Sequence, residues 1–474
     1  MAATSGVKRG HVWFAALCLF GILVVALAGC DAGTEMRDRY VVERMWWKTL
    51  KLENAMRENP DLATDEMQAR LEDGYRAIVE AFPPPEGDVE TMSLDAQAIA
   101  IITARSRFRL ASFAVNRGDL DEAVAVCEGI VEGYGHERSL AVEGLTTLAR
   151  VRQQAGDWDG AVEAYTSLFE TWEPASHSDA PPDMRVLGAP LSVATGYAAA
   201  GDEERASEWY DNARRYYLEL ASKWPGSPTA EAAASRYAES FTLEGRWIEA
   251  AQAYADFDEM YGTEGNRAAV WLALAEIHGR HLGRLDRARD YYKMVVDAYG
   301  DEISGAAAAV EISRMDIDRG RHDAARERLE GVIEGFGDDE PIVATALNLL
   351  GVSHELSGQW DKALARFTEL WRDHSTTMYG LSAPLHIAAH YADAGEENAE
   401  EAALEKAADH YGRIVRDYAG TPAEVVAMNH LFEVRVRQER WEDAEAVLAD
   451  VESQHPGEGW VGAARERLAG LMGE

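Results

Sequence analysis

A repeating pattern of small, larger apolar and polar positions runs along most of the chain. In the clear copies, a turn residue and a short, mostly polar stretch precede an alanine, and a larger side chain follows four residues later. Because residues i and i+4 share one helical face, each alanine and its larger partner predict the buried face of a helix. Glycine suits the turn before that helix, since it adopts the left-handed backbone conformation at little steric cost. Clear copies begin at Gly118, Gly156, Gly201, Gly245, Gly283, Gly320 and Gly358, and weaker ones at Gly395 and Glu439.

The spacing of the copies predicts helices stacked in pairs. The copies begin every 37 to 45 residues, which is typical of a solenoid built from one repeated unit. In seven copies the alanine lies 11 residues before the residue that ends its helix. Two copies differ, but a second alanine and tyrosine restore the spacing, as in Ala213 with Tyr217 and Ala407 with Tyr411. We therefore expect the second helix of those two copies to be about two turns longer.

The copy around Gly358 resembles the tetratricopeptide repeat family. The residues that carry this resemblance are Leu347, Leu350, Gly351, His354, Gly358, Trp360, Ala363 and Phe367. Other copies depart from the family pattern, since Leu329 and Leu448 replace its aromatic residue and Glu439 replaces its glycine. The resemblance covers residues 94–474 and implies an all-α fold, a right-handed superhelical solenoid of about nine stacked antiparallel helix pairs.

Two further regions surround or interrupt the predicted solenoid. Residues 30–93 contain two helical stretches, separated by Asn59-Pro60 and ended by prolines from Pro83 onward. These stretches predict a degenerate helix pair that caps the solenoid. The proline-containing stretch at 173–190 is expected to form a loop that lengthens one repeat.

Residues 1–29 have the pattern of an export signal. Lys8 and Arg9 precede an apolar run at 12–29, which ends with Leu-Ala-Gly before Cys30. A basic start, an apolar core and small final residues indicate a segment that is removed and takes no part in the fold. The last four residues resemble the lipobox of bacterial lipoproteins, which implies cleavage before Cys30 and lipid on its thiol. An uncleaved membrane anchor and an ordinary soluble signal are the alternatives.

The lipobox implies a lipid-anchored protein of the bacterial cell envelope that faces the periplasm. Lipoproteins of this class carry two or three acyl chains, which anchor stably, whereas one chain binds only marginally. Asp31 resembles the signal that retains enteric lipoproteins in the inner membrane, so the inner and the outer membrane are both open. Apart from Cys18 in the signal and Cys30, the chain has one cysteine, Cys127. Its position on a second helix predicts a buried, inert thiol.

The charge of the chain limits its partners. The formal net charge is −37, from 46 Lys plus Arg and 83 Asp plus Glu. This balance argues against nucleic-acid binding, which needs cations to replace the counterions of phosphates. It is also unfavourable for lying broadly on an anionic membrane. A solvated acidic exterior and an acidic groove for a basic partner are both compatible with it.

No motif in the sequence indicates an enzyme. The sequence contains neither a phosphate-binding glycine loop nor a dinucleotide fingerprint. His386 and His390 are one helical turn apart, a spacing that can bind zinc, but no dependable third ligand follows. We therefore predict no catalytic residue, no cofactor and no metal. A metal-dependent enzyme that uses His386 and His390 is an alternative.

The family resemblance also implies where partners bind. In tetratricopeptide repeats, exposed side chains of the first helices line a concave groove that recognises proteins or peptides. The corresponding positions in two copies of this chain are Thr146, Arg150, Gln153, Asn348, Val352 and Glu355. These six residues are the candidate groove residues, of which few would dominate the affinity.

The signal, the repeats and the lack of catalytic motifs together predict a lipid-anchored periplasmic scaffold for envelope proteins. Within that class, the chain is similar to the tetratricopeptide lipoprotein of the outer-membrane β-barrel assembly machinery and to the Tol-Pal-associated repeat protein. Outer-membrane protein assembly and cell-division coordination are therefore the expected processes. An alternative is an accessory protein of exopolysaccharide or cell-wall export that contacts glycan through groove aromatics. However, the tryptophans of the repeats are expected to pack in turns: Trp158, Trp247, Trp360 and Trp441.

Overall fold

The computed structural model describes residues 34–58, 64–85, 87, 89–172, 184–455 and 457–472. These residues form 21 α-helices and two short helices of other types, with no β-strand among them. The predicted all-α fold is confirmed for this part of the chain. The chain divides into two compact units, Met1–Ala253 and Tyr254–Glu474, which we call the N-terminal and C-terminal units. The export signal and Cys30 lie outside the described residues.

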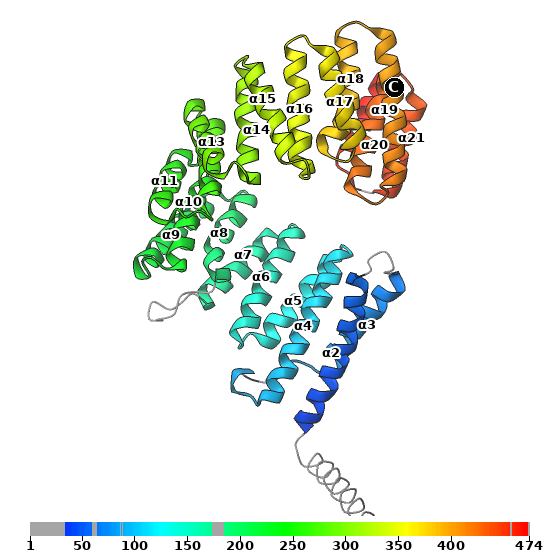
Figure 1. The fold of residues 1–474 in the computed structure, drawn as a ribbon. Helices are drawn as coiled ribbons and strands as arrows, with labels where there is room; N and C mark the ends of the chain where they lie inside the picture. The colour runs from blue at the N-terminus through cyan, green and yellow to red at the C-terminus, as the bar shows by residue number, and fades with distance from the viewer. Residues whose placement is uncertain are drawn as a thin grey trace, which may run out of the picture. The chain divides into compact units, whose positions relative to one another are not determined.

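The helices follow one another in repeated pairs (Figure 1). The first helices of the pairs are α2 (Thr34–Glu58), α4 (Leu94–Asn116), α6 (Arg138–Gln154), α8 (Met184–Ala199), α10 (Pro228–Leu243), α12 (Arg267–Glu276), α14 (Ile303–Asp318), α16 (Glu340–Leu356), α18 (Met378–Asp393) and α20 (Pro422–Arg437). The second helices are α3 (Asp65–Ala81), α5 (Leu120–Tyr134), α7 (Trp158–Trp172), α9 (Glu203–Lys223), α11 (Trp247–Tyr261), α13 (Leu285–Tyr299), α15 (His322–Gly335), α17 (Trp360–Asp373), α19 (Glu397–Asp417) and α21 (Trp441–Gln454). The remaining elements are the 3-10 helix η2 (Val89–Thr91), the π-helix η3 (Ile277–His281) that continues α12, and the last helix, α22 (Trp460–Met472). None of the helices in the described ranges combines the length and apolar character needed to span a membrane.

Consecutive helices pack against each other from α2 to α10 and from α12 to α22, as stacked antiparallel pairs require. The more extensive contacts between alternate helices join first helices only. They connect α2, α4, α6, α8 and α10 in the N-terminal unit, and α12, α14, α16, α18 and α20 in the C-terminal unit. The first helices therefore form a continuous layer in each unit. We call it the first-helix layer.

A residue in the left-handed conformation ends the first helix of the repeated pairs. The eight turn glycines predicted from the sequence have φ values of 64° to 80°. After Gly358, the Gln359 amide donates to the His354 carbonyl oxygen at 2.9 Å, which closes the helix end. Glu439 occupies the ninth turn with a φ of 56°, the only positive value of a non-glycine residue among those described. The predicted register is therefore kept where glycine is replaced.

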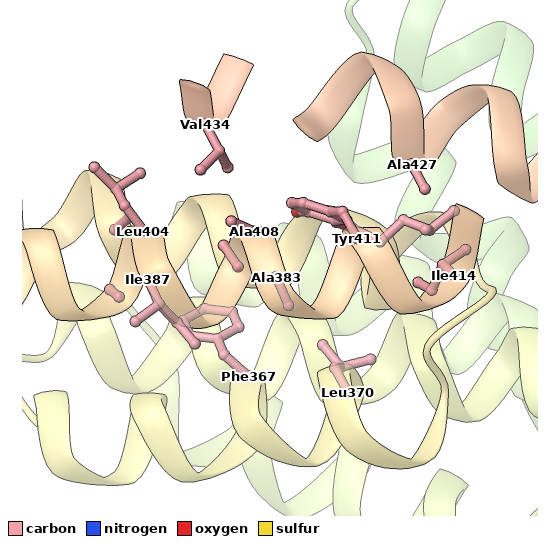
Figure 2. Close-up of a cluster of buried hydrophobic side chains, with 14 of the residues drawn as sticks. Phe367, Leu370, Ala383, Ile387, Leu404, Ala408, Tyr411, Ile414, Ala427 and Val434 are labelled. Atoms are coloured by element: carbon pink, nitrogen blue, oxygen red, sulfur yellow. The ribbon is translucent and has the colours of Figure 1, made fainter. Parts of the chain in front are cut away.

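The predicted alanine and its larger partner form the contact between paired helices. Ala363 is fully buried and Phe367 is 1% exposed. The Phe367 ring lies against Gly351 of the paired helix, where an added Cβ atom would come within 2.5 Å of the ring. Phe367 belongs to one hydrophobic cluster with Leu370 and Ile387 (Figure 2). Small residues thus allow close approach of the helices, and large ones fill the space beside them.

Two second helices are longer than the others, as predicted. α9 and α19 contain 21 residues each, whereas the other second helices from α5 onward contain 14 or 15. A buried tyrosine of each long helix reaches the paired first helix. The Tyr217 hydroxyl donates to the Leu187 carbonyl oxygen at 2.9 Å, and the Tyr411 hydroxyl to that of Leu381 at 2.6 Å. The longer helices thus keep the packing face that the register predicts.

The prediction of a loop at 173–190 is wrong for residues 184–190, which are helical. α8 begins at Met184 and contains Pro190 in its interior. Buried apolar side chains on either side of Pro190 hold this stretch in a helix. A proline disturbs the hydrogen bonds of the preceding helical turn, and the Tyr217 hydroxyl donates to a carbonyl oxygen of that turn. Residues 173–183 of the expected loop lie outside the described residues.

The two helices before residue 94 pack onto the first repeat. α2 and α3 contact each other, and both contact α4. Val42, Tyr75 and Leu110, one from each of these helices, are buried in one cluster. Trp46 packs on Tyr75, with ring centroids 5.6 Å apart, whereas Trp47 is 62% exposed. This arrangement places the predicted capping pair over the first repeat.

We predict that Phe367→Ala destabilises the C-terminal unit by about 3–5 kcal/mol, because it removes a buried ring and leaves a cavity. In stacked repeats the loss also loosens adjoining pairs. Limited proteolysis with mass spectrometry should therefore show faster cleavage around residue 367. Leu356→Ala is the control, because this leucine is 64% exposed. Equal protease sensitivity of the two variants would contradict the assigned core position.

Glu439→Gly should stabilise the C-terminal unit by about 1 kcal/mol, because the left-handed conformation is sterically unfavourable for residues other than glycine. Gly358→Ala is the reverse change at an equivalent turn with a φ of 68°. Apart from Gly358 and its two chain neighbours, no described residue has an atom within 4 Å of the added methyl group, so backbone strain alone should destabilise the unit by a similar amount. Urea unfolding measures both free energies. The idea fails if Glu439→Gly leaves the unfolding midpoint unchanged.

Candidate functional site

A cavity of about 900 Å³ opens on the first-helix layer of the C-terminal unit. α12, α14 and α16 supply Ala273, Met315 and Ile342 to its wall, and α13 supplies Tyr292. We call it the α12–α14 cavity. It lies on first helices, which the sequence predicts to bind partners, although its lining residues are not the predicted ones.

Small residues and a helix irregularity open the α12–α14 cavity. Ala269, Ala273 and Gly279 line it from α12 and η3. In η3, the Leu282 amide donates to the Ile277 carbonyl oxygen, five residues earlier, at 3.0 Å. This is the wider hydrogen-bonding pattern of a π-helix, which is frequent at functional sites. A wider turn and side chains no larger than a methyl group together leave space between α12 and α14.

Four of the five charged residues that line the α12–α14 cavity form two ion pairs, and the fifth is Asp318. Arg280 contacts Glu276 at 2.9 Å, and Arg314 contacts Glu311 at 3.2 Å. Burial raises the pKa of Tyr292 to about 12, and the charges of Glu311 and Glu276 add to this shift. Tyr292 is therefore a neutral phenol at physiological pH. An apolar wall with a paired, charged rim suits an apolar side chain of a polypeptide better than a charged small molecule.

Two of the three predicted groove residues on α16 are engaged within the chain. Val352 packs against two hydrophobic clusters, and Glu355 contacts two histidines of α18. Asn348 is half-buried. Their spacing places all three on one face of α16, so binding through this face stays a prediction.

His386 and His390 both contact the Glu355 carboxylate. His386 Nε2 lies 2.8 Å from one oxygen, and His390 Nδ1 lies 2.6 Å from the other. The His390 ring also stacks on Trp360, with centroids 3.4 Å apart. Within the described part of the chain, no group of three or more His, Cys, Asp or Glu could hold a metal ion. Packing and hydrogen bonding between α16, α17 and α18 account for both histidines.

The three predicted groove residues on α6 lie in different surroundings. Thr146 donates a hydrogen bond to the Val142 carbonyl oxygen at 2.6 Å, and Gln153 accepts one from the Tyr165 hydroxyl at 3.2 Å. Arg150 instead lines a cavity together with residues of α2 and α4. Arg150 is exposed, whereas Thr146 and Gln153 are half-buried.

The sequence prediction missed the α12–α14 cavity. The predicted groove residues belong to copies that match the family well, whereas this cavity depends on residues of neighbouring copies. The available signal was the abundance of small residues on its two walls, among them Ala269, Ala273 and Ala307. Small side chains on facing helices leave room when larger residues do not replace them.

The prediction of a buried thiol at Cys127 is confirmed. Cys127 is fully buried, and burial raises the pKa of its thiol to about 11. Because the thiolate is the reactive form, little of it exists at neutral pH. Cys127 is therefore a core residue and not a candidate site.

Comparison with known proteins supports the repeat assignment in one part of the chain. Residues 316–372 match the family model described as tetratricopeptide repeat. This segment includes the copy around Gly358, which carries the resemblance noted in the sequence. No curated protein matches the chain.

Solved structures of helical proteins are similar to the chain at low identity. Yeast Tom70 is 11% identical, with 90% of this chain and 89% of that chain covered and a TM-score of 0.42. The apo form of the quorum sensor NprR from B. thuringiensis is 12% identical, with coverages of 78% and 99% and a TM-score of 0.40. PilF from Pseudomonas aeruginosa is 16% identical, with coverages of 51% and 96% and a TM-score of 0.33. At these identities and scores, none of the three identifies a partner for this chain.

Proposed function

We propose that this protein is a scaffold that binds other proteins of the bacterial cell envelope and is tethered to a membrane by lipid on Cys30. The observation that carries the binding function is the α12–α14 cavity. Its apolar wall can receive a side chain of a partner, as helical grooves do when they bind peptides. The tetratricopeptide match at 316–372 lies in the C-terminal unit, as the cavity does. Such repeats bind protein partners through grooves.

The size of the α12–α14 cavity suits one anchoring contact of a larger interface. Burying one large apolar side chain contributes about 1.5–3 kcal/mol, which alone supports only weak binding. A stable complex therefore needs further contacts, and the first-helix layer continues past the cavity to α18 and α20. Repeated helix pairs can supply such an extended surface. The protein would then act by holding partners together, without catalysis.

The proposed tether rests on the first 30 residues, which lie outside the described part of the chain. A basic start, an apolar run and Leu-Ala-Gly before Cys30 support export and lipid attachment. Lipid would hold the solenoid near a membrane, while a net charge of −37 disfavours contact with an anionic surface. The solenoid would thus lie in the periplasm. We propose outer-membrane protein assembly or cell-division coordination as its process.

The alternative of glycan contact gains no support from the tryptophans. Trp158, Trp247, Trp360 and Trp441 are each the first residue of a second helix. Trp360 is stacked on His390, and Trp441 packs against the core cluster of the last pairs. Aromatic faces used in packing are not free to stack on sugars.

A photoreactive amino acid at position 315 should crosslink the protein to envelope proteins in living cells, because Met315 lines the α12–α14 cavity. Met294 on α13 is the matched control, since it is 39% exposed and does not line that cavity. Immunoblots should show protein-sized adducts from position 315 that are absent or much weaker from position 294. Equal adducts at both positions, or none at position 315, would count against the proposed groove.

Cys30→Ser should abolish labelling by alkyne-tagged palmitate and release the protein from the membrane fraction, because the substitution removes the proposed acylation site. Cys127→Ser is the control and should keep the label, since the Cys127 thiol is buried. A density gradient that separates the two membranes then shows which one holds the wild-type protein. Labelling that persists in Cys30→Ser would rule out the proposed tether.

A further inference from the structure

A cavity of about 630 Å³ opens on the first-helix layer of the N-terminal unit, between α2, α4 and α6. We call it the arginine cavity. The cavity is lined by one face of each helix, because residues three, four or seven positions apart lie on the same side. Its main lining residues are Trp46 on α2, Arg105, Phe108 and Arg109 on α4, and Glu143 and Arg150 on α6. Aromatic and cationic side chains from three helices thus surround one space.

The arginine cavity is lined mainly by positive charges, whereas the chain as a whole has a negative net charge. Three arginines line it, and Glu143 is the one carboxylate among its described lining residues. The whole chain, in contrast, has 83 Asp plus Glu against 46 Lys plus Arg. Arg105 and Arg109 are also four residues apart on one helix, a spacing at which like charges repel. An anion bound between them would relieve this repulsion.

The arginines of the cavity are accessible to a ligand. Arg105, Arg109 and Arg150 are exposed. The side chains of Arg105 and Arg150 form no ion pair or hydrogen bond with the described residues. Arg109 Nη2 lies 3.3 Å from Glu53, and its side chain is 47% exposed. Glu53 also accepts a hydrogen bond from the Tyr75 hydroxyl, so it is shared between two donors.

The aromatic wall of the arginine cavity is held in place by the core. Trp46 packs edge-on against Tyr75 with ring centroids 5.6 Å apart, and Tyr75 is fully buried. Phe108 is half-buried and packs against a hydrophobic cluster of the first repeat. Fixed aromatic side chains lose little conformational entropy when a ligand binds. The cavity therefore offers apolar contact beside its cationic groups.

We propose that the arginine cavity binds a short acidic segment of a partner protein, an inference that rests on the scaffold function proposed above. Carboxylates of the segment accept hydrogen bonds from Arg105, Arg109 and Arg150. An apolar side chain of the same segment lies against Trp46 and Phe108. The combination selects segments in which acidic and large apolar residues alternate over a few positions.

The surrounding charge favours a short segment over a long polyanion. At physiological ionic strength, charges act over about 8 Å, so the three arginines attract only groups that enter or border the cavity. Farther away, a chain with a net charge of −37 repels DNA and anionic membranes. A short peptide with a few carboxylates gains the attraction and avoids most of the repulsion.

Fluorescence anisotropy with the full chain in neutral detergent tests this proposal. The probe is a labelled pool of short peptides built from Asp, Glu, Phe and Leu. We expect the pool to bind, binding to weaken with added salt, and Arg105→Ala or Arg150→Ala to reduce the affinity about tenfold. Arg150→Lys should restore part of the loss, because lysine keeps the charge but not the planar pair of donors.

Matched controls separate this site from general electrostatics. Arg215→Ala makes the same charge change at an exposed residue of α9 and should bind the pool as well as wild type does. A pool with Asn and Gln in place of Asp and Glu should not bind. Thermal unfolding of each variant shows that the fold is intact.

Several outcomes would overturn the arginine cavity as a peptide site. They are no binding of the acidic pool, equal losses in Arg150→Ala and Arg215→Ala, or stronger binding of single-stranded DNA or phosphatidylglycerol vesicles than of the pool. Crosslinking at position 315 reports on the C-terminal unit and is independent of these results. If position 315 crosslinks while the pool fails to bind, the scaffold function stands and the inference about the arginine cavity falls.

Discussion

The close approach of two helices at a small residue, with a large side chain packed beside it, is the contact on which the whole structure depends. Gly351 and Phe367 show the constraint most directly, because the phenyl ring occupies the space that a Cβ atom at Gly351 would need. The same register recurs in α9 and α19, where Tyr217 and Tyr411 extend it by a further contact with the paired helix. Since each pair packs mainly on its neighbours, repetition of this one contact produces the first-helix layer of each unit.

The sequence predicts this contact well because its determinants lie within one copy of the repeat. Even at Glu439, where the glycine is missing, the alanine and leucine that follow keep the turn in its place. The prediction failed at Pro190, where the proline favoured a loop but buried neighbours maintain the helix. A single copy could not predict the two cavities, because each is formed by residues from several copies.

The contact between Glu355 and the histidines of α18 illustrates that difficulty. Glu355 has the position of a groove residue within its own repeat, but His386 and His390 of the next repeat contact both of its oxygens. A pattern within one copy cannot indicate such a pairing, since it depends on which side chains the neighbouring copy presents. Packing positions are constrained by the shared fold, whereas positions on the first-helix layer are free to differ between copies. The two cavities accordingly differ in chemistry although they lie on equivalent helices.

Net charge is an equally incomplete guide to the binding surfaces. An acidic groove for a basic partner is one interpretation of the −37 charge, but the two cavities differ from that average in different ways. Around the α12–α14 cavity, Glu276 and Glu311 are paired with arginines, and the arginine cavity carries the opposite charge. Because salt screens charges beyond about 8 Å, a partner responds to the residues lining each cavity more than to the average of the chain. The acidic exterior then acts at longer range, where it disfavours nucleic acids and anionic membranes, and the cavities select among the proteins that approach.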